Sequence, residues 1–131
     1  MSSEEILSLP DPQFKAQIVE LILAKQTEVA VELVSKRHKV RTPKLGIGPT
    51  KGKKIALAVY SVQANSILFS DQEHYFDPFV VLHEMYHCIR SASGSHRGTE
   101  KNADRFALDY IESFKMQYAA RGFNLQISKV D

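Results

Sequence analysis

The chain has 131 residues, of which 44% are hydrophobic and 24% are charged, and its net charge is +2. This length and composition are typical of one globular domain, here spanning residues 1–131. The most apolar stretch, residues 16–34, contains four charged side chains, which excludes a bilayer-spanning helix, and no signal peptide is visible. The single cysteine, Cys88, excludes an intrachain disulfide and favours a reducing, cytoplasmic environment.

The N-terminal region, residues 1–38, is expected to be helical. Asp11 followed by Pro12 is typical of a helix start, because aspartate caps helices and proline suits the first helical position. Apolar residues then recur at helical spacing as far as about His38, which predicts one long helix. The residues before it, 3–9, are compatible with a short leading helix.

Residues 39–76 are expected to form a basic loop followed by a small antiparallel sheet. Glycine and proline in 39–54 indicate a loop, with a short strand around 44–48. Segments 55–62 and 65–70 have the composition of two strands joined by a tight turn, which predicts a hairpin.

Residues 77–121 are expected to form two helices that follow the sheet. Asp77-Pro78 repeats the helix-start signal and predicts a helix to about residue 91. After a loop at 92–98, Thr99 is expected to cap a long helix that ends near residue 121, followed by the tail 122–131. The expected core residues of this last helix are Phe106, Ala107, Tyr110, Ile111 and Phe114. The predicted fold class is therefore α+β.

Residues 83–87 read HEMYH, a pattern typical of a zinc site on a helix. His83 and His87 stand four residues apart, so their rings project from one helical face and reach one tetrahedral Zn²⁺ at about 2.0–2.1 Å. Glu84 lies at the edge of that face, where it is placed to take a proton from a water molecule at the metal. The alternative is a chance pairing of two histidines.

A third metal ligand is expected downstream, because a catalytic zinc takes three protein ligands and keeps one position open. Glu100 is the candidate, in the first turn of the last helix. Asp104 lies one turn later on the same face, where it accepts a hydrogen bond from a ligating histidine or else faces solvent. Cys88 points about 100° away from His87 on the helix, which favours a packed core thiol over a fourth ligand.

HEMYH followed by EKNAD is similar to the HExxH…ExxAD pattern of the gluzincin metallopeptidases, over about residues 55–115. It looks closest to the small soluble minigluzincins, whose larger relatives are the membrane-bound CAAX prenyl proteases and HtpX peptidases; the ImmA/IrrE peptidases share a similar arrangement. The resemblance implies a minimal zincin-like domain with Zn²⁺ as cofactor. It implies His83, His87 and Glu100 as zinc ligands, Glu84 as general base and Asp104 as orienting residue.

The resemblance also implies how a substrate is held. The strand before the active-site helix would bind the substrate backbone as an added β-strand, and here that strand comprises Ser66, Ile67, Leu68, Phe69 and Ser70. The candidates for a donor at the developing oxyanion are His96, Arg97 and Tyr110. The expected substrate is a peptide or an unfolded protein segment. As in the small forms, an N-terminal helix or C-terminal tail lying across the cleft would make the chain a latent zymogen.

The segment 35–54 contains eight basic residues and no acidic one. It does not fit a phosphate loop, because Ile47 and Lys54 stand where GxxxxGK[ST] requires glycine and a hydroxyl residue. A solvated loop is the simplest interpretation. The alternative function for the chain is a metal-stabilised, non-catalytic binding protein that uses this segment for nucleic acid or acidic partners. No aromatic residue interrupts the segment to stack on single-stranded bases.

Overall fold

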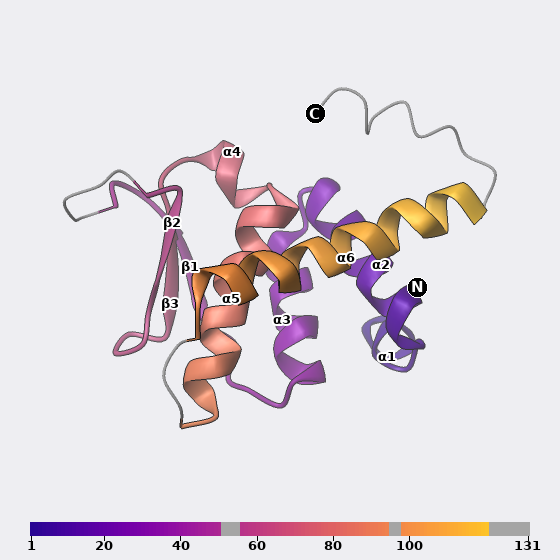
Figure 1. Ribbon diagram of the computed structural model, residues 1–131, viewed down its shortest axis with the longest axis horizontal. Coiled ribbons are helices and arrows are strands. Elements are labelled where there is room, and N and C mark those ends of the chain that lie inside the picture. The colour runs from indigo at the N-terminus through magenta and orange to yellow at the C-terminus, as the bar shows by residue number, and fades with distance from the viewer. Residues whose placement is uncertain (51–55, 95–97, 121–131) are drawn as a thin grey trace.

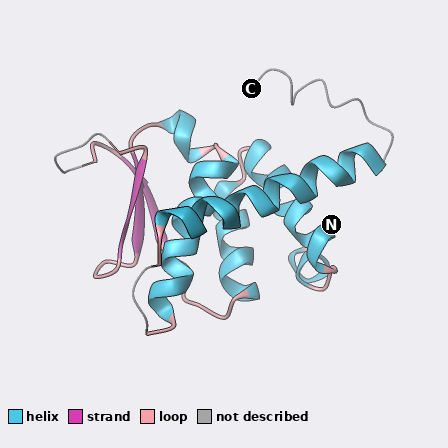
Figure 2. Ribbon diagram, in the orientation of Figure 1, coloured by secondary structure: helices cyan, strands magenta, loops and turns pink. Residues whose placement is uncertain are grey.

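The computed structural model describes residues 1–50, 56–94 and 98–120. This described part contains six helices and a three-stranded sheet, which confirms the predicted α+β class. The sheet lies at one end of the molecule with the helices packed beside it (Figures 1 and 2). The elements in chain order are α1 (Ser3–Leu7), α2 (Asp11–Leu23), α3 (Thr27–Arg37), β1 (Lys44–Ile47), β2 (Ala58–Ser61), β3 (Ser66–Phe69), α4 (Gln72–Tyr75), α5 (Pro78–Ala92) and α6 (Glu100–Ala120).

The N-terminal region contains two helices, α2 and α3, where the sequence pattern predicted one. The prediction was wrong at Lys25, whose φ of 65° lies in the left-handed region. The N–H of Gln26 donates to the carbonyl of Leu21 at 2.8 Å, and the N–H of Lys25 donates to that of Ile22 at 3.0 Å. These two bonds form the Schellman motif that ends many helices. Because lysine rather than glycine holds the left-handed position, the sequence carried no visible stop signal.

The helices α1 and α3 are also fixed at their ends. Ser2 and Glu5 form a reciprocal capping box at the start of α1, so the short leading helix is present. A second Schellman motif ends α3: Lys39 has a φ of 58°, and the N–H of Val40 donates to the carbonyl of Ser35 at 2.9 Å. The backbone at Lys39 is therefore held in one place.

The sheet has the strand order β1–β3–β2 and is mixed. Strands β2 and β3 form the predicted antiparallel hairpin, with Ala58 opposite Phe69. Strand β1 pairs in parallel with the other edge of β3, so the prediction of a purely antiparallel sheet was wrong. The reason is where the chain enters the sheet: the N–H of Lys44 donates to the carbonyl of Asn65 in the hairpin turn at 3.0 Å. Strand β1 therefore starts beside the start of β3 and runs in the same direction.

The two helices that carry the HEMYH motif and Glu100 start where the sequence predicted. A carboxylate oxygen of Asp77 accepts the N–H of Phe79 at 2.9 Å and caps α5. The hydroxyl of Thr99 accepts an N–H from the first turn of α6 at 3.1 Å. The predicted end of α6 and the tail 122–131 lie outside the described residues. The helix α4, capped by Asp71, was not predicted.

The hydrophobic core lies between the helices and one face of the sheet, with α6 running across the molecule against α2 and α5 (Figure 1). The residues of α6 that the sequence assigned to the core are buried or packed against it: Phe106, Ala107, Tyr110, Ile111 and Phe114. From α2, Phe14, Ile18 and Ile22 are fully buried. The N-terminal helix α2 is thus part of the core.

Candidate metal centre

The HEMYH segment lies in the middle of α5, and its two histidines share one face, as the sequence predicted. The rings of His83 and His87 have their centroids 5.2 Å apart. His87 is fully buried, and the side chain of His83 is 14% exposed. Other positions of α5, including Leu82 and Met85, are buried in the core. This packing anchors the helix and fixes the direction in which both rings project.

Glu100, in the first turn of α6, contacts both histidines. Its Oε1 lies 2.9 Å from Nε2 of His83, and its Oε2 lies 2.8 Å from Nε2 of His87. The carboxylate itself is 71% exposed, so it closes the site from the solvent side. A carboxylate in the first turn is also favoured by the positive end of the helix dipole. The structure thus brings together the three residues that the sequence proposed as ligands.

The geometry of these three residues suits a metal ion. One ligand atom from each of His83, His87 and Glu100 lies within 4.8 Å of the others, so the group can hold an ion. A tetrahedral ion with bonds of about 2.0–2.1 Å places its ligand atoms about 3.3 Å apart. The carboxylate therefore needs to withdraw by only about half an ångström to admit one. Two imidazole nitrogens and one carboxylate form a donor set that zinc and several other divalent ions accept.

Asp104 lies one turn after Glu100 and contacts the outer nitrogen of His83. The distance from Oδ1 of Asp104 to Nδ1 of His83 is 2.9 Å. Because a carboxylate only accepts hydrogen bonds, Nδ1 is the donor in this contact, and Nε2, which faces Glu100, is the nitrogen on the side of the metal position. Asp104 therefore occupies the position that the sequence assigned to the orienting residue.

Glu84 is buried beside the metal position and lines a cavity. Its side chain is 9% exposed, and its Oε2 lies 3.9 Å from Nε2 of His83. The cavity has a volume of about 220 Å³ and is also lined by Phe79 and Val80 of α5, by Ala56–Ala58 at the start of β2, and by the ligands His83 and Glu100. Its wall is mainly apolar, so Glu84 is a carboxylate at the edge of an apolar pocket.

Gly98 determines how closely α6 approaches α5, a feature that the sequence reading did not identify. Gly98 has a φ of +81°, and a Cβ atom there would lie 2.6 Å from Cε2 and 2.8 Å from the hydroxyl oxygen of Tyr86. Tyr86 in turn packs edge-on against His87, with ring centroids 5.7 Å apart. Glycine thus lets the chain pass directly over the Tyr86 ring two residues before Glu100. The sequence signal was Gly98 itself, which had been interpreted only as a loop residue.

The strand assigned to substrate binding lies in the wrong place for that role. Residues Ser66–Phe69 form β3, which is the central strand and pairs with β1 on one side and β2 on the other. Both of its edges are therefore used, and an added strand has nowhere to pair. Within the described part of the chain, β2 pairs only with β3, and the start of β2 lines the Glu84 cavity. The edge of β2 replaces β3 as the candidate.

Of the three candidate oxyanion donors, Tyr110 is the one that lies in the described part of the chain. Tyr110 is 1% exposed and packs in the core, with Lys15 of α2 over its ring at 5.6 Å, so its prediction was wrong. His96 and Arg97 lie outside the described residues. Cys88 is buried, and its thiol faces Asn65 at 3.7 Å, away from the ligands, in agreement with the expected core role. Burial raises the pKa of the Cys88 thiol.

The segment 35–54 is not one solvated loop, because it contains the end of α3 and all of β1. Lys36 forms an ion pair with Glu32 at 3.2 Å. Arg37 donates to the carbonyl oxygens of Leu7 and Leu9 and lies over the ring of Phe14 at 4.2 Å. Residues 51–55, with three of the lysines, lie outside the described part. Some of the basic residues therefore have structural roles.

Comparison with known proteins does not extend these observations. No family model, curated protein or solved structure matches the chain. Among the described residues, no helix combines the length and apolar character needed to cross a membrane. The geometry of the centre is therefore the basis for assigning a function.

Proposed function

We propose that this chain is a small zinc-dependent peptidase of the gluzincin type. The observation that carries the proposal is the position of Glu84, which is buried on the cavity side of three convergent ligand residues. A site that only stabilises a fold has no need of a buried carboxylate next to its ligands, and it usually closes the fourth metal position with a protein group.

His83, His87 and Glu100 are the residues that would hold the zinc ion. Asp104 supports this assignment, because it fixes the tautomer that leaves Nε2 of His83 as a lone-pair donor. When bound, zinc supplies Lewis acidity, which lowers the pKa of water and polarises a carbonyl group. Three protein ligands would leave one coordination position of such an ion open to solvent or substrate.

Glu84 is the proposed general base and then general acid. Its carboxylate accepts a proton from the attacking water and returns that proton to the nitrogen of the leaving amine. Apolar residues, including Phe79 and Val80, line the pocket beside Glu84 in which this transfer would take place. Asp104 fixes the orientation of the neighbouring His83 ring, so the distance between Glu84 and this metal ligand is also fixed.

The substrate is proposed to be an extended peptide or an unfolded protein segment. The edge of β2 that pairs with no strand among the described residues supplies backbone donors and acceptors to such a segment, as in other complexes where a strand is added to a sheet. The cavity of about 220 Å³ next to Glu84 is of a size for one apolar side chain. None of the residues that line it belongs to the N-terminal helices. Latency, through an N-terminal helix or the C-terminal tail, stays a prediction.

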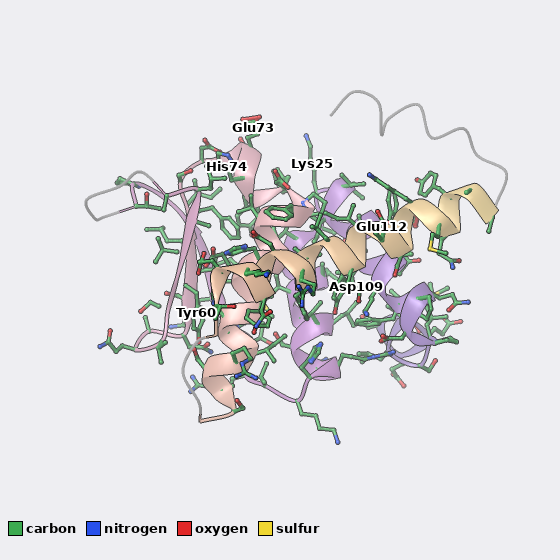
Figure 3. The ribbon with its side chains drawn as sticks, in the orientation of Figure 1. Lys25, Tyr60, Glu73, His74, Asp109 and Glu112 are labelled. Atoms are coloured by element: carbon green, nitrogen blue, oxygen red, sulfur yellow. The ribbon has the colours of Figure 1, made fainter. Side chains whose placement is uncertain are left out.

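Two measurements on the full chain test this proposal. The first is elemental analysis after loading with zinc: the wild type should hold about one ion, and His87→Ala and Glu100→Ala should each lose it. The second is hydrolysis of a fluorescently labelled unfolded protein. Glu84→Gln should retain zinc and lose activity by about 10²–10⁴-fold, whereas Glu112→Gln, an exposed change on the far half of α6 (Figure 3), should retain both.

Two outcomes contradict the proposal. Zinc-loaded wild type that does not cleave the substrate indicates a metal that only stabilises the fold. Full activity in Glu84→Gln means that another group is the base. Zinc retained by Glu100→Ala would instead move the third ligand, with Asp104 as the first candidate.

A further inference from the structure

A second pocket lies at the opposite end of α5 from the Glu84 cavity. Its volume is about 400 Å³, and it is bounded by the last turns of α5, the β2–β3 hairpin and the segment that leads from α3 to β1. Tyr60 of β2, labelled in Figure 3, forms part of its wall. The complete lining is Lys39, Val40, Arg41, Tyr60, Val62, Asn65, Cys88, Ser91 and Ala92.

The charge of this pocket is one-sided. Lys39 and Arg41 line it, and no aspartate or glutamate does. Neither cation forms an ion pair with the described acidic side chains, unlike Lys36 and Arg37 just before them. The Schellman motif at the end of α3 fixes the backbone of Lys39, and Arg41 follows two residues later. The positive charge is therefore placed by the fold rather than by a loose loop.

The rest of the lining offers hydrogen bonds and apolar contact. The hydroxyl of Tyr60 donates to Oδ1 of Asn65 at 2.8 Å, which orients both side chains. The hydroxyl oxygen of Ser91 is buried and has no hydrogen-bond partner among the described residues, an arrangement that is costly unless a ligand or water completes it. Val40 and Val62 supply apolar surface beside these groups.

We propose that this basic pocket binds the carboxylate of an acidic peptide segment. Arginine and lysine side chains form strong, charge-assisted hydrogen bonds with carboxylates. The pocket is large enough for one or two amino-acid side chains, and its mixed lining suits the alkyl and carboxylate parts of glutamate. The inference is carried by two cations, Lys39 and Arg41, that line the same pocket as a buried hydroxyl oxygen with no hydrogen-bond partner among the described residues.

The pocket suits a peptide better than a nucleic acid. The C-terminal end of α5 carries partial negative charge, which offsets part of the charge of Lys39 and Arg41. The reduced positive charge favours binding of a single carboxylate over binding of several successive phosphate groups. Tyr60 is nearly buried and hydrogen-bonded, so it offers no open face for a base. Lys36 and Arg37, which precede Lys39 in the chain, are engaged within the protein.

Binding of an acidic peptide in this pocket does not depend on the metal centre. If the chain is also a peptidase, the pocket has a consequence for the choice of substrate. Ala58 lines the Glu84 cavity, and Tyr60, two residues later on the same face of β2, lines the basic pocket. Two residues of a strand span about 7 Å. One extended peptide is therefore long enough to occupy both, so substrates would carry an acidic residue a few positions from the cleaved bond.

Binding of a labelled peptide to the full chain tests the proposal. The probe is a fluorescein-labelled hexapeptide of alternating glutamate and alanine, compared with the same peptide containing glutamine and with a single-stranded oligonucleotide. Fluorescence anisotropy is measured with and without zinc. The test variant is Lys39→Gln/Arg41→Gln, and the control is Lys36→Gln/Arg105→Gln, which removes the same net charge elsewhere. Ala92→Phe, at the exposed end of α5, fills the pocket without changing charge.

The glutamate peptide should bind in both zinc conditions, and the glutamine peptide should bind at least about tenfold more weakly. Lys39→Gln/Arg41→Gln and Ala92→Phe should each weaken binding by about tenfold, and the control variant should change it little. Equal binding of the two peptides, or equal losses in the test and control variants, overturns the proposal. An oligonucleotide that binds more tightly than the peptide, and that depends on Lys39 and Arg41, also overturns it and assigns the pocket to nucleic acid. Because none of these readouts requires cleavage, failure of the peptidase proposal leaves them interpretable.

Discussion

Nδ1 of His83 on α5 lies 2.9 Å from Oδ1 of Asp104 on α6. This contact joins the two helices that supply the metal ligands, and it acts on the ring that also faces Glu100 at 2.9 Å. An imidazole whose outer nitrogen donates to a carboxylate keeps its inner nitrogen free to bind a metal, and its ring orientation is fixed. The relation between Asp104 and His83 therefore prepares the centre for an ion.

Removing this contact should weaken metal binding without removing a ligand. In Asp104→Ala, His83 loses its orienting acceptor, and we expect zinc affinity to fall by about 10–100-fold. Competition with a chromogenic chelator measures this change. Glu112→Ala, an exposed substitution two turns further along α6 (Figure 3), is the control and should leave the affinity unaltered. Equal affinities for Asp104→Ala and the wild type would show that the carboxylate faces solvent and does not act on the site.

Adding one methyl group at Gly98 should disturb the centre through Tyr86. The new Cβ would come within 2.6 Å of the Tyr86 ring, so either the ring or the chain leading to Glu100 must shift. We expect zinc affinity to fall by about tenfold, since the shift acts on Glu100 and on the ring next to His87.

Gly94→Ala is the matched control for this substitution. Gly94 has the same left-handed backbone, with a φ of +85°, but nothing lies within 4 Å of a Cβ there. Both variants should lose about 1 kcal/mol of folding stability from backbone strain, but only Gly98→Ala should lose metal affinity. Tyr86→Ala in the Gly98→Ala background should restore part of the affinity. Equal metal affinities for the two alanine variants would contradict the proposed role of Gly98.

Alkaline pH should destabilise the fold through Tyr60. Burial, with a smaller contribution from Cys88, raises the pKa of Tyr60 from 10.0 to about 12. Between these two values the unfolded chain loses the phenolic proton while the folded chain keeps it, so stability falls as pH rises. Urea denaturation across this range measures the effect. In Tyr60→Phe this part of the decline should be absent.

The stability of Tyr60→Phe at lower pH provides a control for this prediction. Below about pH 9, Tyr60→Phe should be less stable than the wild type by about 1 kcal/mol, because the hydrogen bond to Asn65 is lost. This difference should narrow as the pH rises from 10.0 toward 12. Curves for the two proteins that stay parallel across this range would show that Tyr60 titrates equally in both states.

Phe14→Ala should test whether the N-terminal helices belong to the core. Phe14 is fully buried, and the guanidinium of Arg37 lies over its ring at 4.2 Å. Truncation to alanine should cost about 3–5 kcal/mol, whereas Phe14→Leu should cost less than about 1.5 kcal/mol. Chemical denaturation gives both values. A loss below 1 kcal/mol for Phe14→Ala would indicate a detachable N-terminal segment instead.

Local signals in the sequence predicted several elements well. Asp77 and Thr99 marked the starts of α5 and α6, because a capping side chain satisfies N–H groups within its own turn. The alternating segments predicted the β2–β3 hairpin. This signal is also local, because the register of a hairpin depends on the short turn between its two strands. The break at Lys25 was missed because the left-handed residue there is a lysine, which carries no stop signal.

By itself, the sequence determined the α+β class and the spacing of His83 and His87 on one helical face, and it placed the candidates Glu100 and Asp104 one turn apart on the next helix. These features depend on periodicity and on the order of capped elements, which are local properties of the chain. Only the tertiary structure decided that β3 is a central strand and that Tyr110 is a core residue. It also revealed the pocket that joins Lys39 and Arg41 to Ser91. Edges, burial and pockets arise when segments distant in sequence pack together, so no local pattern specifies them.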